Sequence, residues 1–165
     1  MSAETARPVV LIDGRSGSGK TTLGRALAQR LGARLVSLDE VYPGWDGLAA
    51  AARAVPRMLA ADRPGFRSGP WGPGGAGTWN PIDPSEPLVV EGCGALTRRS
   101  RRLATLGVWL EAPTGVRRRR ALRRDPAFAV DWARWAAQER AHFAREHPRV
   151  LADRVLRLSS GRTSS

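Results

Sequence analysis

The sequence is almost without lysine. Of the 27 lysine and arginine residues in the 165-residue chain, only Lys20 is a lysine. Arginine therefore serves wherever a positive charge is needed except at this one position. The pattern indicates that position 20 needs a slim, compact point charge, which the broad and planar guanidinium group does not provide.

Cysteines and long apolar runs are also scarce. Cys93 is the only cysteine, which excludes an internal disulfide and a metal site built from several cysteines. No apolar run reaches 18 residues, and the first residues, MSAETARP, lack the apolar stretch of a secretory signal. These absences favour a cytoplasmic protein without a membrane partner. We expect one domain over residues 1–165, with a core at about 8–158 and a disordered tail at 159–165.

Acidic residues are too few to balance the arginines, and the net charge is +12. Such an excess suggests an anionic partner. It does not by itself distinguish a nucleotide from a nucleic acid or an acidic surface.

A glycine-rich motif surrounds the single lysine. The stretch GRSGSGKT, residues 14–21, follows an apolar run at 8–13 that predicts a buried strand, and it precedes a helical pattern at 20–32. Glycines let the backbone curl so that successive N–H groups and the helix N-terminus face phosphate oxygens. The motif predicts ATP binding by Gly14, Arg15, Ser16, Gly17, Ser18, Gly19, Lys20, Thr21 and Thr22, with the Thr21 hydroxyl on Mg²⁺.

Acidic residues follow two further predicted strands. Asp39 comes just after a strand at 35–38, where it is placed to act as a base or to organise the nucleophile, and Tyr42 is close to it. The alternative is that Asp39 caps a helix that begins near Trp45, a position that Asp46 also suits. Glu91 ends the apolar run LVVE, a pattern typical of a carboxylate that supports Mg²⁺. Strands are also expected at about 106–110 and near 153–158.

The segment 63–87 is rich in proline and glycine but contains Phe66, Trp71 and Trp79. One interpretation is a flexible surface loop. Because disordered linkers are poor in aromatics, the other is an ordered flap in which Phe66 and Trp71 contact a ring-shaped substrate.

A predicted helix that starts at 113–114 carries six arginines within a stretch of eight residues. Arg117, Arg120 and Arg124 share one face of it, so they are placed to hold phosphates in two-pronged contacts: Arg120 and Arg124 during transfer, Arg117 on ATP. The alternative is a solvated basic face. An amphipathic helix follows within 129–148, and we expect its His142 and His147 at the surface. A kink or break is expected at Pro56 in the helix at 47–62.

Four stretches in order, GRSGSGKT, SLDEVY, VVEG and RRRRALRRD, resemble the phosphate-loop (P-loop) small-molecule kinases, nearest the uridine kinase-like and nucleoside monophosphate kinase-like group. Uridine kinases carry a similar Asp-x-x-Tyr, a similar strand ending in Glu-Gly, and arginines that lead into Arg-Asp. The matching residues here are Asp39, Tyr42, Glu91, Gly92, Arg117, Arg120, Arg124 and Asp125. The resemblance spans about residues 8–158. It implies an α/β fold with a parallel sheet of about five strands, helices on both faces and an arginine-rich lid.

The function favoured by these motifs is transfer of the γ-phosphoryl group of ATP to a hydroxyl or phosphate of a small, nucleoside- or nucleotide-like acceptor. The resemblance does not identify the acceptor, because the glycine-rich segment before residue 88 does not match the nucleoside-binding residues of uridine kinases. One alternative is an ATP-binding regulatory NTPase. A less favoured one is an arginine-rich nucleic-acid-binding protein, which would leave the single lysine unexplained.

Overall fold

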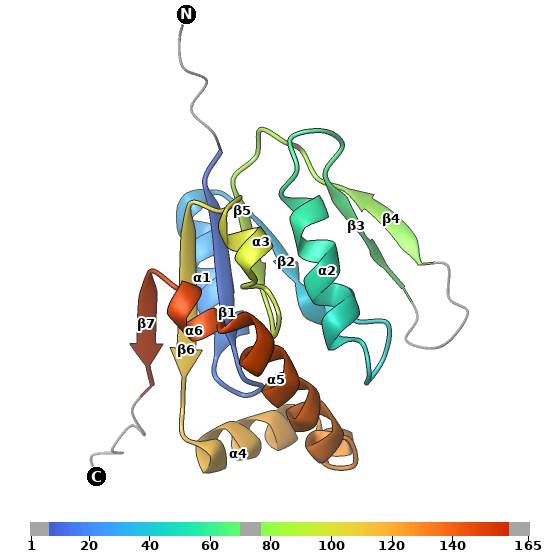
Figure 1. Cartoon of the computed structure of the whole chain (residues 1–165), viewed down its shortest axis with the longest axis vertical. Coiled ribbons are helices and arrows are strands. Elements are labelled where there is room, and N and C mark those ends of the chain that lie inside the picture. Colours follow the sequence, from blue (N-terminus) through green and yellow to red (C-terminus); the bar gives the residue numbers. More distant parts are fainter. Residues whose placement is uncertain (1–6, 70–76, 159–165) are drawn as a thin grey trace, which may run out of the picture.

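A five-stranded parallel sheet forms the centre of the computed structural model, which describes residues 7–69 and 77–158 (Figure 1). The strand order is β2-β5-β1-β6-β7, and every neighbouring pair is parallel. The strands are β1 (Val9–Gly14), β2 (Arg34–Ser37), β5 (Leu88–Glu91), β6 (Leu106–Glu111) and β7 (Arg154–Arg157). The predicted α/β class with a five-stranded parallel sheet is confirmed, and the arginine-rich lid stays a prediction. Trp71 and the tail predicted at 159–165 lie outside the described residues.

Helices cover both faces of the sheet (Figure 1). Val10 and Ile12 of β1 pack toward α1 (Lys20–Leu31), whereas Val9 and Leu11 belong to the core beneath α2 (Leu48–Met58) and α5 (Trp132–Glu146). Successive side chains of a strand point to opposite faces. An apolar run without alternation, as in β1, therefore supplies both cores at once.

The other elements flank this sandwich. Helix α4 (Thr114–Arg124) lies across the carboxyl end of the sheet, and a hairpin of β3 (Gly65–Ser68) and β4 (Thr78–Pro81) lies beyond α2 (Figure 1). Short helices complete the chain: η1 (Leu38–Glu40), α3 (Arg98–Arg101), η2 (Pro126–Ala129) and α6 (Pro148–Leu151). The segment 63–87 is therefore ordered at least in its described part, as an antiparallel pair of strands.

Three local expectations are corrected by the structure. Helix α2 is not broken at Pro56, which lies in its last turn and removes only one hydrogen bond, but the helix ends at Met58 rather than near residue 62. The N-cap of α2 is Gly47, so neither Asp39 nor Asp46 caps this helix. His142 is 2% exposed rather than at the surface, and burial lowers its pKa.

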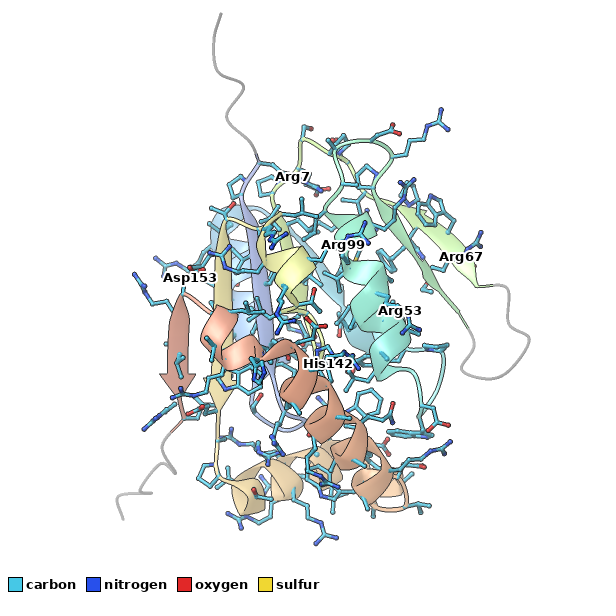
Figure 2. The ribbon with its side chains drawn as sticks, viewed as in Figure 1. Arg7, Arg53, Arg67, Arg99, His142 and Asp153 are labelled. Carbon is cyan, nitrogen blue, oxygen red and sulfur yellow. The ribbon has the colours of Figure 1, made fainter. Side chains whose placement is uncertain are left out.

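The arginines spread over the outer surface. Figure 2 shows Arg53, Arg67 and Arg99 on α2, β3 and α3, and all three are exposed. Among the described residues, no helix has both the length and the apolar character needed to cross a membrane.

Candidate active site

The glycine-rich loop joins β1 to α1 at the carboxyl end of the sheet. Gly17 and Gly19 have φ angles of 78° and 97°, in the left-handed region that favours glycine. A Cβ atom on Gly17 would lie 2.1 Å from the carbonyl oxygen of Arg117. A side chain at position 17 would therefore collide with the backbone of α4, so the loop and α4 depend on this glycine for their close approach.

Lys20 lies inside this loop and is only 8% exposed. Its Nζ donates a hydrogen bond to the carbonyl oxygen of Arg15, 3.0 Å away. Burial lowers the pKa of Lys20, but the surrounding acidic groups raise it more, and the net shift is upward. These groups are Cys93, Glu91, Glu139 and Asp13. The ammonium group therefore stays charged where the motif predicts phosphate oxygens.

Asp13, at the end of β1, is a site residue that the sequence analysis missed. Its carboxylate accepts hydrogen bonds from the backbone N–H groups of Gly14 (2.7 Å), Leu96 (2.8 Å) and Gly94 (3.2 Å). These bonds tie the start of the phosphate loop to the segment that follows β5. Burial raises the pKa of Asp13 to about 7, although the N–H donors oppose the shift.

Thr21 and Glu91 form a pair of oxygen ligands beside the loop. The Thr21 hydroxyl donates to Glu91 Oε1 at 3.1 Å, and Glu91 is 2% exposed at the end of β5. A hydroxyl and a carboxylate at this position suit Mg²⁺, which prefers oxygen ligands and keeps several waters. Within the described residues no group of three or more His, Cys, Asp or Glu side chains could hold a metal ion. An ion here would therefore need phosphate oxygens and water to complete its shell.

A cavity of about 480 Å³ opens between the phosphate loop and α4. At one end it is lined by residues 16, 17 and 19–22 of the loop and helix α1. Asp39 of η1 and Arg120 and Arg124 of α4 also line it. The structure thus brings four predicted catalytic residues, Lys20, Asp39, Arg120 and Arg124, to one cavity, because they follow strands whose carboxyl ends share one edge of the sheet.

Four aromatic residues that contact one another also line the cavity, Tyr42, Trp45, Phe128 and Trp135, and this part of the lining is called the aromatic end. The rings of Trp45 and Phe128 stack with centroids 4.9 Å apart, and Tyr42 meets Trp135 edge-on at 4.7 Å. The Tyr42 hydroxyl donates to the carbonyl oxygen of Cys93 at 2.8 Å, and burial raises its pKa. Tyr42 therefore stays neutral. Of the four residues, only Tyr42 was predicted to bind substrate.

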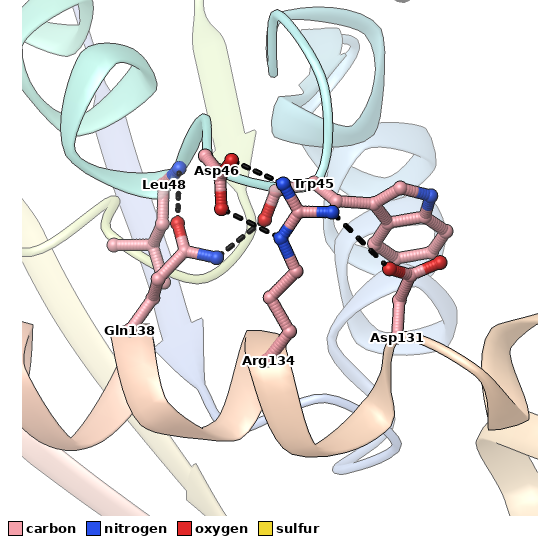
Figure 3. A network of polar contacts seen from close by, with 6 residues as sticks. All are labelled: Trp45, Asp46, Leu48, Asp131, Arg134 and Gln138. Carbon is pink, nitrogen blue, oxygen red and sulfur yellow. Dashed lines mark hydrogen bonds and ion pairs between the residues drawn. The ribbon is translucent and has the colours of Figure 1, made fainter.

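The segment that carries Trp45 is held by α5, as Figure 3 shows. Arg134 makes a two-pronged contact with Asp46, with Nε 2.7 Å from Oδ1, and a further contact with Asp131. Gln138 donates to the carbonyl oxygen of Trp45 and accepts the N–H of Leu48 at 3.4 Å. Trp45 thus owes its position to side chains about 90 residues further along the chain.

Several predicted site residues do not line this cavity: Gly14, Arg15, Ser18, Arg117 and Phe66. Arg117 was expected on ATP beside Arg120 and Arg124, but it is 5% exposed and donates to the carbonyl oxygens of Ala112 (3.1 Å) and Ser16 (3.3 Å). Its place in the first turn of α4 directs it to backbone rather than to the opening. Phe66 was expected on the substrate, but β3 turns its ring into the core, and Arg34 lies over the ring at 5.9 Å.

Two other residues of the loop, Arg15 and Ser18, have different surroundings. The guanidinium of Arg15 lies over the ring of Phe143 at 5.4 Å, and with Arg117 it lines a second cavity of about 710 Å³. Ser18 is fully buried, and its hydroxyl has no hydrogen-bond partner among the described residues.

Several solved structures with a similar fold are described as small-molecule kinases. A structure described as a possible uridine kinase from Bacillus stearothermophilus aligns over 92% of this chain and 89% of its own, with a TM-score of 0.62 and 19% identity. A shikimate kinase from Acinetobacter baumannii aligns over 94% of this chain and 86% of its own, with a TM-score of 0.57 and 20% identity. A gluconokinase from Sinorhizobium meliloti 1021 aligns over 93% of this chain and 84% of its own, with a TM-score of 0.53 and 20% identity.

No family model matches the sequence, and no curated protein is similar to it at a significant level. At the identities found, the likeness establishes the fold. The chain described here has the fold of the P-loop small-molecule kinases, as its motifs predicted.

Proposed function

We propose that this protein is an ATP-dependent phosphotransferase that moves the γ-phosphoryl group to a small acceptor. The observation that carries the proposal is the single cavity in which the phosphate loop, Asp39 and the two arginines of α4 meet. Phosphoryl transfer needs positioning and charge stabilisation more than covalent chemistry, and these residues supply both.

The loop end of the cavity would hold ATP. Backbone N–H groups of the loop and the start of α1 would bind the phosphates, and Lys20 would contact the β- and γ-phosphates. Thr21 and Glu91 would hold Mg²⁺, which neutralises phosphate charge when bound. Arg120 and Arg124 would face the charge that develops on the moving phosphoryl group.

Asp39 would act on the acceptor. It lies at the cavity, is exposed, and follows β2 next to the phosphate loop. In the transfer the acceptor oxygen forms a bond to the γ-phosphorus, and the bond from that phosphorus to the β–γ bridging oxygen breaks. A hydroxyl acceptor loses its proton to the Asp39 carboxylate, and ADP leaves.

The aromatic end would receive the acceptor. Stacked and edge-on rings suit a flat ring, which favours a nucleoside- or nucleotide-like acceptor, as the resemblance to uridine kinases implies. Asp125 adds a third carboxylate to the lining, besides Asp39 and Glu91.

The test is an ATP-consumption screen against nucleosides, nucleotides, sugars and sugar acids, with the Lys20→Ala protein as the control. We expect ADP release that depends on a ring-bearing acceptor and is lost in the variant. ADP release that is equal with and without every acceptor would contradict the proposal.

A further inference from the structure

Helix α5 carries one buried acid that the proposed chemistry does not use. Glu139 is 2% exposed and lies on the same inward face as Trp135 and His142. A carboxylate at this depth is costly unless hydrogen bonds and opposite charges compensate it. What surrounds Glu139 therefore indicates what it does.

The main partner of Glu139 is the phosphate loop itself. Oε1 accepts the backbone N–H of Ser16 at 2.7 Å, and the thiol of Cys93 donates to the same oxygen at 3.4 Å. On the other side of Ser16, its carbonyl oxygen accepts a hydrogen bond from Arg117 Nη1 at 3.3 Å. Ser16 is therefore held from α5 and from α4 at once.

The negative charge of Glu139 also acts on two buried cations, Lys20 beside the loop and Arg117 of α4. Burial lowers the pKa of Lys20 and of Arg117, and the negative charge of Glu139 opposes this shift at both residues. Glu139 thus offsets part of the cost of burying these two positive charges. Hydrogen bonds in which one partner is ionised are also among the stronger ones in proteins.

We propose that Glu139 is a positioning residue of the nucleotide site. It holds the Ser16 part of the phosphate loop in the conformation that receives phosphates, so less ordering remains to be done when ATP binds. Glu139 acts through Ser16, which lines the cavity. This inference rests on the proposed function, because it takes the loop to be the site of ATP.

The experiment measures, by calorimetry, the Kd of the protein for a non-hydrolysable ATP analogue in the presence of magnesium. In Glu139→Ala we expect the Kd to rise about tenfold, which corresponds to about 1.4 kcal/mol. Glu139→Gln keeps an acceptor oxygen for the Ser16 N–H, so its Kd should stay within about threefold of wild type. The matched control is Glu146→Ala on the same helix, where Oε2 accepts the N–H of Arg98 at 3.2 Å, away from the loop. Its Kd should not change.

A second measurement needs no variant. In the wild-type protein without nucleotide, the Ser16 amide should exchange its hydrogen slowly, although it lies in a loop. Fast exchange there, an unchanged Kd in Glu139→Ala, or a loss in Glu139→Gln equal to that in Glu139→Ala would each overturn the inference. A wild-type protein that binds no ATP analogue would contradict the proposed function as well, so the two failures are distinguishable.

Discussion

The two ends of the cavity differ in what holds them in place. At the phosphate loop, glycine conformations and backbone contacts set the geometry, and a short continuous motif contains most of the residues. At the aromatic end, two regions far apart in the sequence, 42–45 and 128–135, contribute two rings each, and a side chain of α5 holds Trp45. The comparison shows that one end is specified locally and the other by tertiary packing.

This difference leads to distinct expectations for variants. Changes in the loop should abolish turnover, because no other residue can take the place of a backbone-defined phosphate site. Changes at the aromatic end should alter the acceptor KM more than the handling of ATP.

The largest effect is expected at Lys20. Lys20→Ala should lower kcat/KM by on the order of 10³-fold, because it removes a buried charge from the phosphates. Lys20→Arg should cost nearly as much, since a planar guanidinium does not fit a site closed by the Arg15 carbonyl oxygen. Steady-state kinetics of both variants make the test. Near-normal turnover in the arginine variant would show that charge alone suffices.

The next effect is expected at Asp39, which lines the same cavity. Asp39→Asn should lower kcat by about 10²-fold with little loss of ATP binding, because the amide cannot take the acceptor proton. Single-turnover rates together with nucleotide affinity separate the two quantities. A collapse of ATP affinity with unchanged kcat would instead assign Asp39 to the metal or to the structure.

The arginines of α4 should show a smaller and uneven effect. Arg124→Ala and Arg120→Ala should each lower kcat by about tenfold or more, beyond any loss of ATP binding, since the charge that they face develops during transfer. Arg118→Ala and Arg119→Ala are matched controls on the same helix, at positions that do not line the cavity, and should be mild. Equal dispensability of all four, with RNA binding falling at each step, would favour the nucleic-acid interpretation.

Closure of α4 over bound substrates stays a prediction. Hydrogen exchange across residues 116–132 should slow when ATP and acceptor are both bound, because a closed helix excludes water from the transfer. Unchanged exchange with both ligands present would mean that α4 is a fixed wall.

The phosphate-loop part of the site could be predicted from the sequence, whereas most of the aromatic end could not. The loop, the acids after β2 and β5 and the arginines of α4 were predicted, because each follows a strand at the carboxyl edge of the sheet. Phe66 was placed wrongly, since loop composition does not show which face of a strand turns inward. Trp45, Phe128 and Trp135 were missed as site residues because their convergence depends on how α5 packs.

Charged residues show the same limit. Arg117 shares a helix face with Arg120 and Arg124, yet one turn of difference places it against backbone carbonyls. Glu139 was visible as the polar exception on an apolar helix face, and that signal could have marked it. The partner of Glu139, the backbone N–H of Ser16, could not be predicted, because every residue except proline has such a group and the sequence does not show which one a side chain will contact.

A pH-dependent effect on stability is expected at Asp13. Its pKa is about 7 in the folded protein and 3.8 as an ordinary aspartate, so the folded state binds the proton more tightly. Asp13 therefore contributes stability that is full below about pH 4 and is lost as the pH rises to about 7, by at most about 1.4 kcal/mol per pH unit. Denaturant unfolding from pH 4 to 8 should show this slope. Asp13→Asn should remove it, and an unchanged slope in the variant would contradict the assignment.

The smallest effect is expected where α5 holds the Trp45 segment. Asp46→Asn should raise the acceptor KM by about twofold to threefold and leave the ATP KM unchanged, because the Arg134–Asp46 pair is exposed and such pairs contribute little. A Gln138→Ala variant, which loses contacts to two backbone groups of the segment, should act in the same direction more strongly. An effect on ATP instead would break the separation between the two ends.

The most direct test of the account follows the label of [γ-³²P]ATP. The central claim is that one cavity holds both ATP and an acceptor, so the phosphoryl group should leave on the acceptor. With a ring-bearing acceptor found in the screen, we predict that most of the label appears on that molecule, and that Lys20→Ala transfers none. Label that appears only as inorganic phosphate, at the same rate with or without acceptor, would contradict the account and identify an NTPase.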